Sequence, residues 1–255
     1  MKPEEYAQKV LSDFGIFDIP ALNFKKIFDA CKITCDEMEY EDIKYSGSLH
    51  RFHDEAIILI NTKIKNIGRI NFTKAHELGH YFMKHKGNIF ECTSLDIRTN
   101  DNQNKPFEVE ANKFASEFLM PEMMIKPIVL SQPFDFDTIN FICNTFKVSK
   151  TAAVFKMLDY VDGNYAVVFS QNGIVTHCKL SKNMMDRVKL LDKDNYIPES
   201  SFSYKVINCK LQMSGYTQLD DSCWIRNTQN VRVYEFARAN QKYKTVLTLL
   251  YFELY

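Results

Sequence analysis

The chain has 255 residues, of which 45% are hydrophobic and 25% charged, and this length and composition suit one large or two modest globular domains. Its 32 basic residues balance its 32 acidic ones, so no overall charge attracts nucleic acid or an anionic membrane. No apolar run approaches the roughly 20 residues that cross a bilayer, and seven scattered cysteines without a Cys-x-x-Cys pair are typical of reduced thiols, so we expect a soluble, cytoplasmic protein with no membrane partner.

The N-terminal region predicts two short helices followed by strands. Apolar residues at helical spacing indicate helices over residues 3–13 and 23–30. From Ile33 to Phe52 the pattern becomes strand-like, and we expect a turn at Gly47. The apolar run over residues 55–61 predicts a central strand, which leads into the next helix.

A predicted helix over residues 69–86 carries the most informative motif of the chain, His76-Glu77-Leu78-Gly79-His80. Histidines four residues apart lie on one face of a helix, where both imidazoles reach one metal ion. The intervening Glu77 projects beside them and is placed to act on water at that metal. With six histidines in the chain, chance would produce this motif on the order of 0.01 times, so the motif favours a metal site.

The region that follows predicts a loop and then a series of helices. Residues 87–105 predict a mobile surface loop, because the end of this stretch is polar and rich in asparagine. Helices are predicted over residues 107–120 and 121–127, and a helix-turn-helix-like pair over residues 134–146 and 149–161. The second helix of this pair offers only two lysines to DNA, so we favour a packing unit and do not expect direct DNA binding.

The C-terminal third has the pattern of a small α+β domain. Residues 165–179 predict a hairpin around the turn Asn172-Gly173. Residues 182–191 predict a helix, and residues 231–236 and 244–253 predict further strands. This region contains no chemical constellation of its own.

A catalytic zinc ion usually takes three protein ligands, so the histidine pair needs a partner. In one arrangement a third histidine lies six residues after the second, and that position holds Lys86. His85 falls one residue short and is interpreted as a helix-end or supporting residue, while His50 and His53 precede the central strand without any pattern. Histidine therefore does not complete the site in a recognisable way.

Glutamates of the predicted helix over residues 107–120 are the alternative, and the candidates are Glu108, Glu110 and Glu117. Glu108 and Glu110 lie on opposite shoulders of this helix, each about 80° from the centre of its apolar stripe, so helical geometry does not choose between them. A closed structural site would prefer cysteine as a ligand, and we expect no cysteine near His76 or Glu110.

Two stretches resemble the ImmA/IrrE family of metallopeptidases. They read Phe72-Thr73-x-Ala75-His76-Glu77-Leu78-Gly79-His80-Tyr81 and, later, Glu108-x-Glu110-Ala111-Asn112-x-Phe114-Ala115-x-x-Phe118-Leu119-Met120-Pro121. The likeness covers roughly residues 20–160, whereas residues 165–255 match nothing recognisable. For the site, the resemblance implies zinc, or alternatively manganese, bound by His76, His80 and Glu110. Glu77 is then implied as the general base for the attack of water on a peptide carbonyl.

This family characteristically cleaves helix-turn-helix transcriptional repressors. The resemblance therefore implies an endopeptidase that switches on stress-response or mobile-element genes, with a separate repressor protein as its partner. The rival hypothesis is a non-proteolytic regulatory protein, such as a transcription regulator or a toxin–antitoxin component, that keeps the fold and binds DNA or a partner. Glu77 weighs against the rival, because a binding module has no need of a general base.

We therefore expect an α+β protein in three parts. A zincin-like, gluzincin-type metallopeptidase domain covers residues 1–130, a helix-turn-helix-like helical segment covers residues 131–162, and a smaller α+β domain covers residues 163–255. The last part is expected to sense a signal or to hold the substrate.

Overall fold

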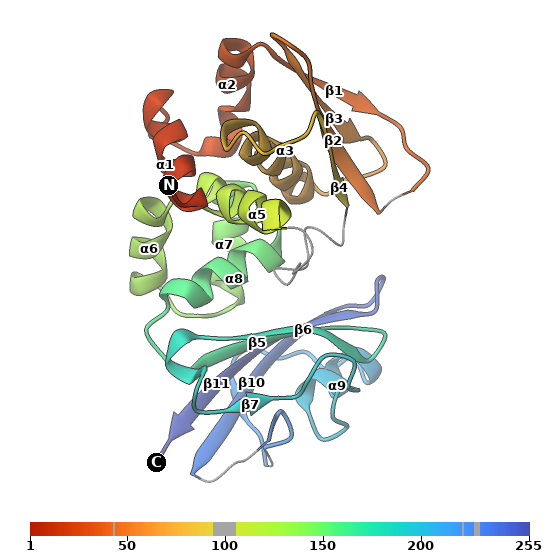
Figure 1. Ribbon diagram of the computed structural model, residues 1–255. Coiled ribbons are helices and arrows are strands. Elements are labelled where there is room, and N and C mark those ends of the chain that lie inside the picture. The colour runs from red at the N-terminus through yellow and green to blue at the C-terminus, as the bar shows by residue number, and fades with distance from the viewer. Residues whose placement is uncertain (43, 94–105, 221, 227–229) are drawn as a thin grey trace. The chain divides into compact units, whose positions relative to one another are not determined.

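The computed structural model of the chain describes residues 1–42, 44–93, 106–220, 222–226 and 230–255 (Figure 1). The contacts divide the chain into two compact units that together make an α+β protein, as expected from the sequence. Unit 1 comprises residues 1–127 and 139–153, and unit 2 comprises residues 128–138 and 154–255. The segment 131–162, expected as one helical part, is therefore divided between the two units.

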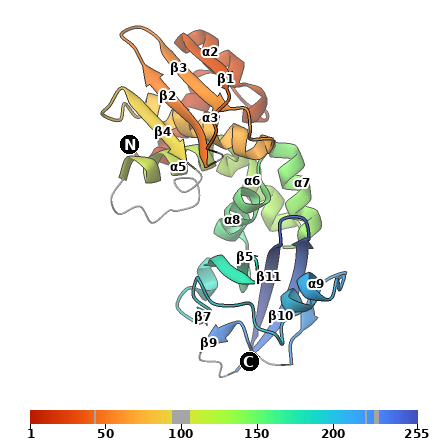
Figure 2. The same ribbon diagram turned by 90° about the vertical axis from the view of Figure 1, so that its right-hand side faces the viewer.

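Unit 1 contains a four-stranded sheet with the strand order β1-β3-β2-β4. β1 and β3 run parallel, and β2 pairs antiparallel with both β3 and β4. The elements up to residue 160 are α1 (Pro3–Asp13), the 3-10 helix η1 (Pro20–Leu22), α2 (Phe24–Cys31), β1 (Ile33–Met38), β2 (Tyr45–Arg51), β3 (Ala56–Asn61), α3 (Ile67–Phe82), β4 (Ile89–Thr93), α5 (Pro106–Leu119), α6 (Glu122–Ser131), α7 (Phe136–Phe146) and α8 (Lys150–Tyr160). Figure 2 shows α3 beside this sheet, where it contacts β2, β3 and β4.

Strand β2 packs closely against β3 and α3 at Gly47, a residue that we expected in a turn. Gly47 lies inside β2, opposite Ile60 of β3, so the expected turn is wrong. A Cβ added at Gly47 would collide with the carbonyl oxygen of Leu59 and would lie 2.9 Å from Cγ2 of Thr73 on α3. The glycine is needed because β3 and α3 both press against this point of the strand.

Strand β4 lies within the stretch expected to be a surface loop. Residues 89–93 pair with β2, and Phe90 and Cys92 point into the interior while Ile89 and Glu91 are exposed. This alternation is the pattern of a half-buried strand, but five residues are too few for it to stand out in the sequence. The rest of the expected loop, residues 94–105, lies outside the described residues.

The start of α3 is fixed by a cap and by a close contact with the turn between α7 and α8. The side chain of Asn66 accepts a hydrogen bond from the backbone N–H of Arg69. A Cβ added at Gly68 would lie 2.5 Å from the carbonyl carbon of Val148, and Asn71 Nδ2 donates a 2.9 Å hydrogen bond to the carbonyl of Lys147. The turn of the helical pair thus packs on α3, which supports its interpretation as a packing unit.

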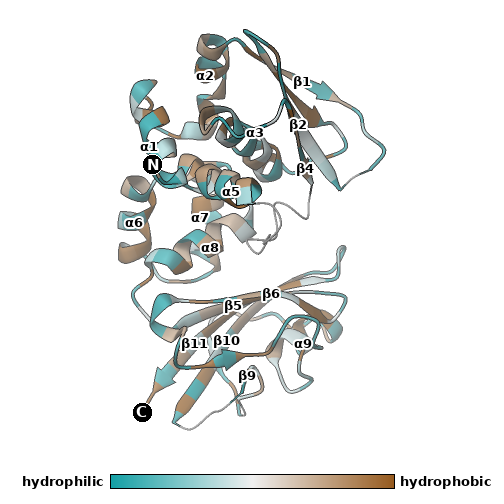
Figure 3. Cartoon of the chain, viewed as in Figure 1, coloured by the Kyte–Doolittle hydropathy of each residue, from teal (hydrophilic) through white to brown (hydrophobic). Residues whose placement is uncertain are grey.

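Unit 2 contains a five-stranded antiparallel sheet with the order β6-β5-β11-β10-β8. Its further elements are β5 (Tyr165–Gln171), β6 (Ile174–Leu180), the 3-10 helix η2 (Lys182–Met184), β7 (Lys189–Leu190), α9 (Phe202–Asn208), β8 (Thr217–Gln218), β9 (Ile225–Arg226), β10 (Val231–Asn240) and β11 (Thr245–Leu254). Apolar residues recur along β10 and β11 in Figure 3, and the core includes the fully buried Trp224.

The hairpin predicted in unit 2 is present, but one predicted helix is wrong. Asn172 and Gly173 both have positive φ angles, 52° and 80°, as a two-residue hairpin turn requires. Residues 182–191 form only η2 and β7 rather than the expected helix, whereas residues 202–208 form α9, which is capped by the hydroxyl of Ser201. Among the described residues, no helix has both the length and the apolarity that crossing a bilayer requires.

Candidate metal centre

Two imidazole rings from α3 face each other inside unit 1. His76 and His80, one helical turn apart, are both fully buried, and their Nε2 atoms lie 3.0 Å apart. Every residue from 75 to 80 is buried by the neighbouring elements. The motif therefore lies in the interior of the unit.

Glu108, in the first turns of α5, completes a cluster with this pair. Its Oε2 lies 3.0 Å from Nε2 of His76, and its Oε1 lies 3.6 Å from Nε2 of His80. The ligand atoms of the three side chains lie within 4.8 Å of one another, and Glu108 is only 8% exposed. These three side chains could together hold a metal ion.

Glu110, the third ligand implied by the family resemblance, points elsewhere. Its Oε2 lies 3.0 Å from Nε2 of His85, and its side chain is 47% exposed. Helices α3 and α5 approach closely at Gly79, where an added Cβ would lie 3.2 Å from Cα of Ala111. This contact turns the α5 face of Ala111 and Glu108 toward α3, and a residue two positions after Glu108 projects about 200° away around the helix. The structure thus brings Glu108, rather than Glu110, to the histidines.

The proton positions in this cluster suit a cation. Nδ1 of His76 lies 2.9 Å from Oδ1 of Asn112, and because an amide oxygen only accepts hydrogen bonds, Nδ1 carries the ring proton. Nε2 of His76 then presents its lone pair toward Glu108, whose carboxylate is also an acceptor. Acceptors therefore converge on one buried point, and a set of two imidazoles and one carboxylate fits the ligands that zinc prefers.

The pKa values of these groups favour the forms that bind a metal. Burial lowers the pKa of His80 to about 4, so the ring is neutral near pH 7. Burial alone would raise the pKa of Glu108, but the neighbouring rings of His76 and His80 outweigh this effect and hold the pKa of Glu108 below its usual range. The cluster thus offers a neutral imidazole and an ionised carboxylate, as metal ligation requires.

Glu77, the general base implied by the motif, is fully buried on α3 beside a cysteine. A carboxylate oxygen of Glu77, a ring nitrogen of His76 and Sγ of Cys92 lie within 4.8 Å of one another. The expectation that no cysteine lies near His76 is therefore wrong. Cys92 reaches this place through the pairing of β4 with β2, where it lies opposite Gly47, and no motif spacing signals it.

The remaining candidates lie apart from the cluster. His50 hydrogen-bonds the serine two residues before it on β2, and His53 is exposed. Neither belongs to a group of potential metal ligands in the described part of the chain. Glu117 accepts hydrogen bonds from Gln8 of α1 and from the backbone of Glu122, so it joins helices together.

Comparison with known proteins gives a family and a similar fold. Residues 39–158 match the Peptidase_M78 family, described as the IrrE N-terminal-like domain. A search of curated proteins finds no match. Among solved structures, a Mycobacterium tuberculosis transcriptional regulator is similar, with a TM-score of 0.56 and 12% sequence identity over 97% of this chain and 86% of that chain. At this identity the likeness concerns the fold.

Proposed function

Because residues 39–158 belong to the IrrE N-terminal-like domain family, we propose that this chain is a metal-dependent endopeptidase with a zincin-like centre on α3 and α5. The observation that carries the proposal is the convergence of His76, His80 and Glu108 on one buried point. We propose zinc as the ion, with manganese as an alternative that the same ligands tolerate. Glu108 takes the place that the family resemblance gave to Glu110.

The residues around this point would divide the work of peptide hydrolysis. When bound, zinc would polarise the peptide carbonyl and make a water molecule more acidic. Glu77 accepts a proton from the attacking water on its carboxylate and later delivers it to the leaving amine. Asn112 holds the proton on Nδ1 of His76, which keeps the Nε2 lone pair of this ring directed at the metal position.

We further propose a helix-turn-helix transcriptional repressor as the substrate, in a system that controls stress-response or mobile-element genes. This step is supported by the family resemblance alone. A non-proteolytic regulator is the second candidate, because the similar fold belongs to a transcriptional regulator. The buried Glu77 beside the cluster disfavours it, since burying a carboxylate is costly and a binding module gains nothing from it.

Metal content and cleavage, measured on matched variants, test the proposal. Mass spectrometry of freshly purified protein should find one equivalent of zinc in the wild type and in Glu77→Gln, and none in Glu108→Ala. Glu110→Ala should retain the metal at micromolar protein concentration. With a repressor substrate, Glu77→Gln should cleave about 10²–10⁴-fold more slowly than the wild type.

Two results would contradict the proposal. One is a wild-type protein that binds neither zinc nor manganese when either is supplied. The other is metal retained in Glu108→Ala but lost in Glu110→Ala, which would return the ligand role to Glu110. Operator DNA shifted by the intact chain in an electrophoretic mobility assay, with no cleavage of the repressor, would favour the second candidate.

A further inference from the structure

We propose that His85 and Glu110 form a hydrogen-bonded relay behind His80, which positions this histidine for the metal. The inference rests on the proposed metal centre. Nδ1 of His80 lies 2.8 Å from Nδ1 of His85, and Nε2 of His85 lies 3.0 Å from Oε2 of Glu110. His80 on α3, His85 just after this helix and Glu110 on α5 thus form a line of hydrogen-bonded side chains that leads away from the metal position.

With both rings neutral, the carboxylate of Glu110 at the end of this line determines which ring nitrogen of His85 and of His80 carries the proton. The carboxylate of Glu110 only accepts hydrogen bonds, so Nε2 of His85 carries the ring proton and donates it. Nδ1 of His85 is then an acceptor, and it receives a hydrogen bond from the N–H at Nδ1 of His80. His80 is left with its lone pair on Nε2, the nitrogen that faces His76 and Glu108.

For a neutral His85 ring, the same geometry disfavours the opposite proton arrangement. If His80 carried its proton on Nε2, its Nδ1 would be an acceptor and would need a donor at Nδ1 of His85. Nε2 of His85 would then face the Glu110 carboxylate with a lone pair, and two acceptors would meet at 3.0 Å. Glu110 therefore disfavours the tautomer of His80 that cannot bind a metal through Nε2.

The relay is held in place by its surroundings. The His85 side chain is 3% exposed, and its ring packs against the rings of His80 and Phe107, at centroid distances of 4.9 and 4.7 Å. The chain turns back to this position through Lys84, which has a left-handed φ of 53°. Arg51 donates hydrogen bonds to the carbonyl oxygens of His85, at 2.8 Å, and of His80.

The two histidines of the pair are therefore supported in different ways. Nδ1 of His76 meets the amide of Asn112, whereas Nδ1 of His80 is linked through His85 to the carboxyl group of Glu110. The outer end of the relay borders a pocket of about 320 Å³ lined in part by His85, Phe107 and Glu110. The two glutamates of the Glu-x-Glu motif thus have separate tasks, one at the metal and one behind it.

Zinc affinity, measured by competition with a chromophoric chelator, tests the relay without reference to proteolysis. Glu110→Ala and His85→Phe should each raise the zinc dissociation constant about 10–100-fold. Glu110→Gln should recover much of this loss, because an amide oxygen accepts the same hydrogen bond. Lys113→Ala, an exposed change on the same helix, should leave the constant unchanged.

A second measurement reports the proton position itself. Long-range ¹H–¹⁵N NMR of the histidine rings in the metal-free protein should show His80 protonated on Nδ1 in the wild type, and a mixture of tautomers in Glu110→Ala. A zinc constant and a tautomer that are both unchanged in Glu110→Ala would overturn the relay while leaving the metal centre intact. Failure of the wild type to bind zinc would instead reject the proposed function, and the NMR result would still decide the relay.

Discussion

Glu235 of β10 is a fully buried carboxylate that joins several elements of unit 2. Its Oε1 accepts hydrogen bonds from the backbone N–H and the hydroxyl of Ser203, and its Oε2 accepts them from the backbone of Phe202 and from Trp224 Nε1. Burial raises the pKa of Glu235, and these four hydrogen bonds reduce the effect without cancelling it. The carboxylate thus anchors the start of α9, but ionising it inside the core is costly.

We predict that this carboxyl group makes the stability of unit 2 fall as pH rises. Its pKa is higher in the folded than in the unfolded chain, so between the two values the folded state binds more protons. The contribution to stability is therefore present below the ordinary carboxyl pKa and is lost as pH rises through the folded one. Glu235→Gln lacks this titration, and its amide N–H₂ would meet two donors at a cost of about 1–3 kcal/mol.

Urea unfolding of the wild type and of Glu235→Gln at a series of pH values measures this effect. The difference in unfolding free energy between the two proteins should be largest at pH values below the ordinary carboxyl pKa and should shrink as pH rises through the higher pKa of the folded state. A difference that stays constant or grows with pH would show that burial does not dominate the ionisation of Glu235.

At the scale of elements, the close approach of α3 to the turn between α7 and α8 depends on one residue. Gly68 occupies the first turn of α3, where alanine would ordinarily stabilise the helix by about 0.5–1 kcal/mol. Here an added Cβ would collide with the backbone N of Ser149 and lie 2.5 Å from the carbonyl carbon of Val148. Backbone atoms in a packed turn have no easy way to move aside, so the collision outweighs the helix propensity.

We therefore predict that Gly68→Ala destabilises the protein by about 1–3 kcal/mol, against the usual sign of a glycine-to-alanine change in a helix. Gly215→Ala is the matched control, because a Cβ at Gly215 has no neighbour within 4 Å among the described residues. Thermal or urea unfolding of both variants provides the measurement. A Gly68→Ala protein as stable as the control would mean that the turn between α7 and α8 does not press on α3.

The elements that the sequence predicts well are those with strong local signals. Helices α3 and α5 have long apolar periodicity, and the hairpin of β5 and β6 has an Asn-Gly turn. The sequence misses β4 and α9, which have five and seven residues, because so few positions do not distinguish one period from another. It also takes the apolar residues of 182–191 for a helical stripe, although the chain there forms η2 and β7.

The residues of the candidate site also differ in whether a local sequence pattern predicts them. The pair His76 and His80 follows from helical spacing alone, which is a local property. The choice between Glu108 and Glu110 depends on which shoulder of α5 turns toward α3, and the close contact at Gly79 decides it. Cys92 depends on strand register, and register joins residues that are far apart in the sequence. Properties set by such distant contacts are beyond the reach of motif spacing.

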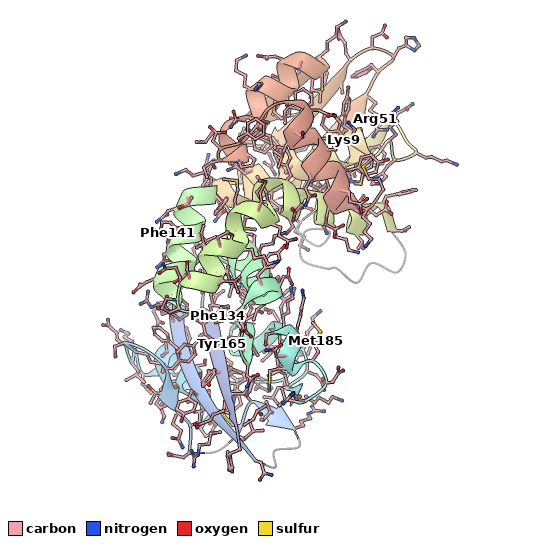
Figure 4. All side chains as sticks on the ribbon, turned by 90° about the vertical axis from the view of Figure 1, so that its left-hand side faces the viewer. Lys9, Arg51, Phe134, Phe141, Tyr165 and Met185 are labelled. Carbon is pink, nitrogen blue, oxygen red and sulfur yellow. The ribbon has the colours of Figure 1, made fainter. Side chains whose placement is uncertain are left out.

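At the scale of the whole molecule, the helical region contributes residues to both units. Residues 139–153 belong to unit 1, whereas residues 128–138 and 154–162 belong to unit 2. The ring centroids of Phe134 and Tyr165 lie 4.7 Å apart, and those of Phe136 and Phe236 lie 4.8 Å apart. Figure 4 labels Phe134 and Tyr165, whose side chains lie side by side. Phe134 and Phe136 therefore depend on β5 and β10 of the following sheet for their aromatic contacts.

We predict that the fragment of residues 1–162 does not fold as a stable protein. Deletion of residues 163–255 would leave Phe134 and Phe136, now 3% and 1% exposed, without their aromatic neighbours. It would also remove the 2.7 Å ion pair of Lys179 with Asp159 on α8. Exposed apolar surface of this kind should appear as increased binding of a hydrophobic dye and as a lower unfolding midpoint than in the full chain.

A fragment with native-like stability and dye binding would contradict this prediction and would show that unit 1 is independent. If the prediction holds, deletion at residue 163 is an unsuitable test of whether unit 2 senses a signal or holds the substrate, because loss of cleavage would also follow from loss of folding. No single truncation yields unit 1 alone, since residues 139–153 follow residues 128–138 in the chain. Point substitutions at exposed positions of the sheet, such as Arg232→Ala with zinc content as the control, separate the two effects.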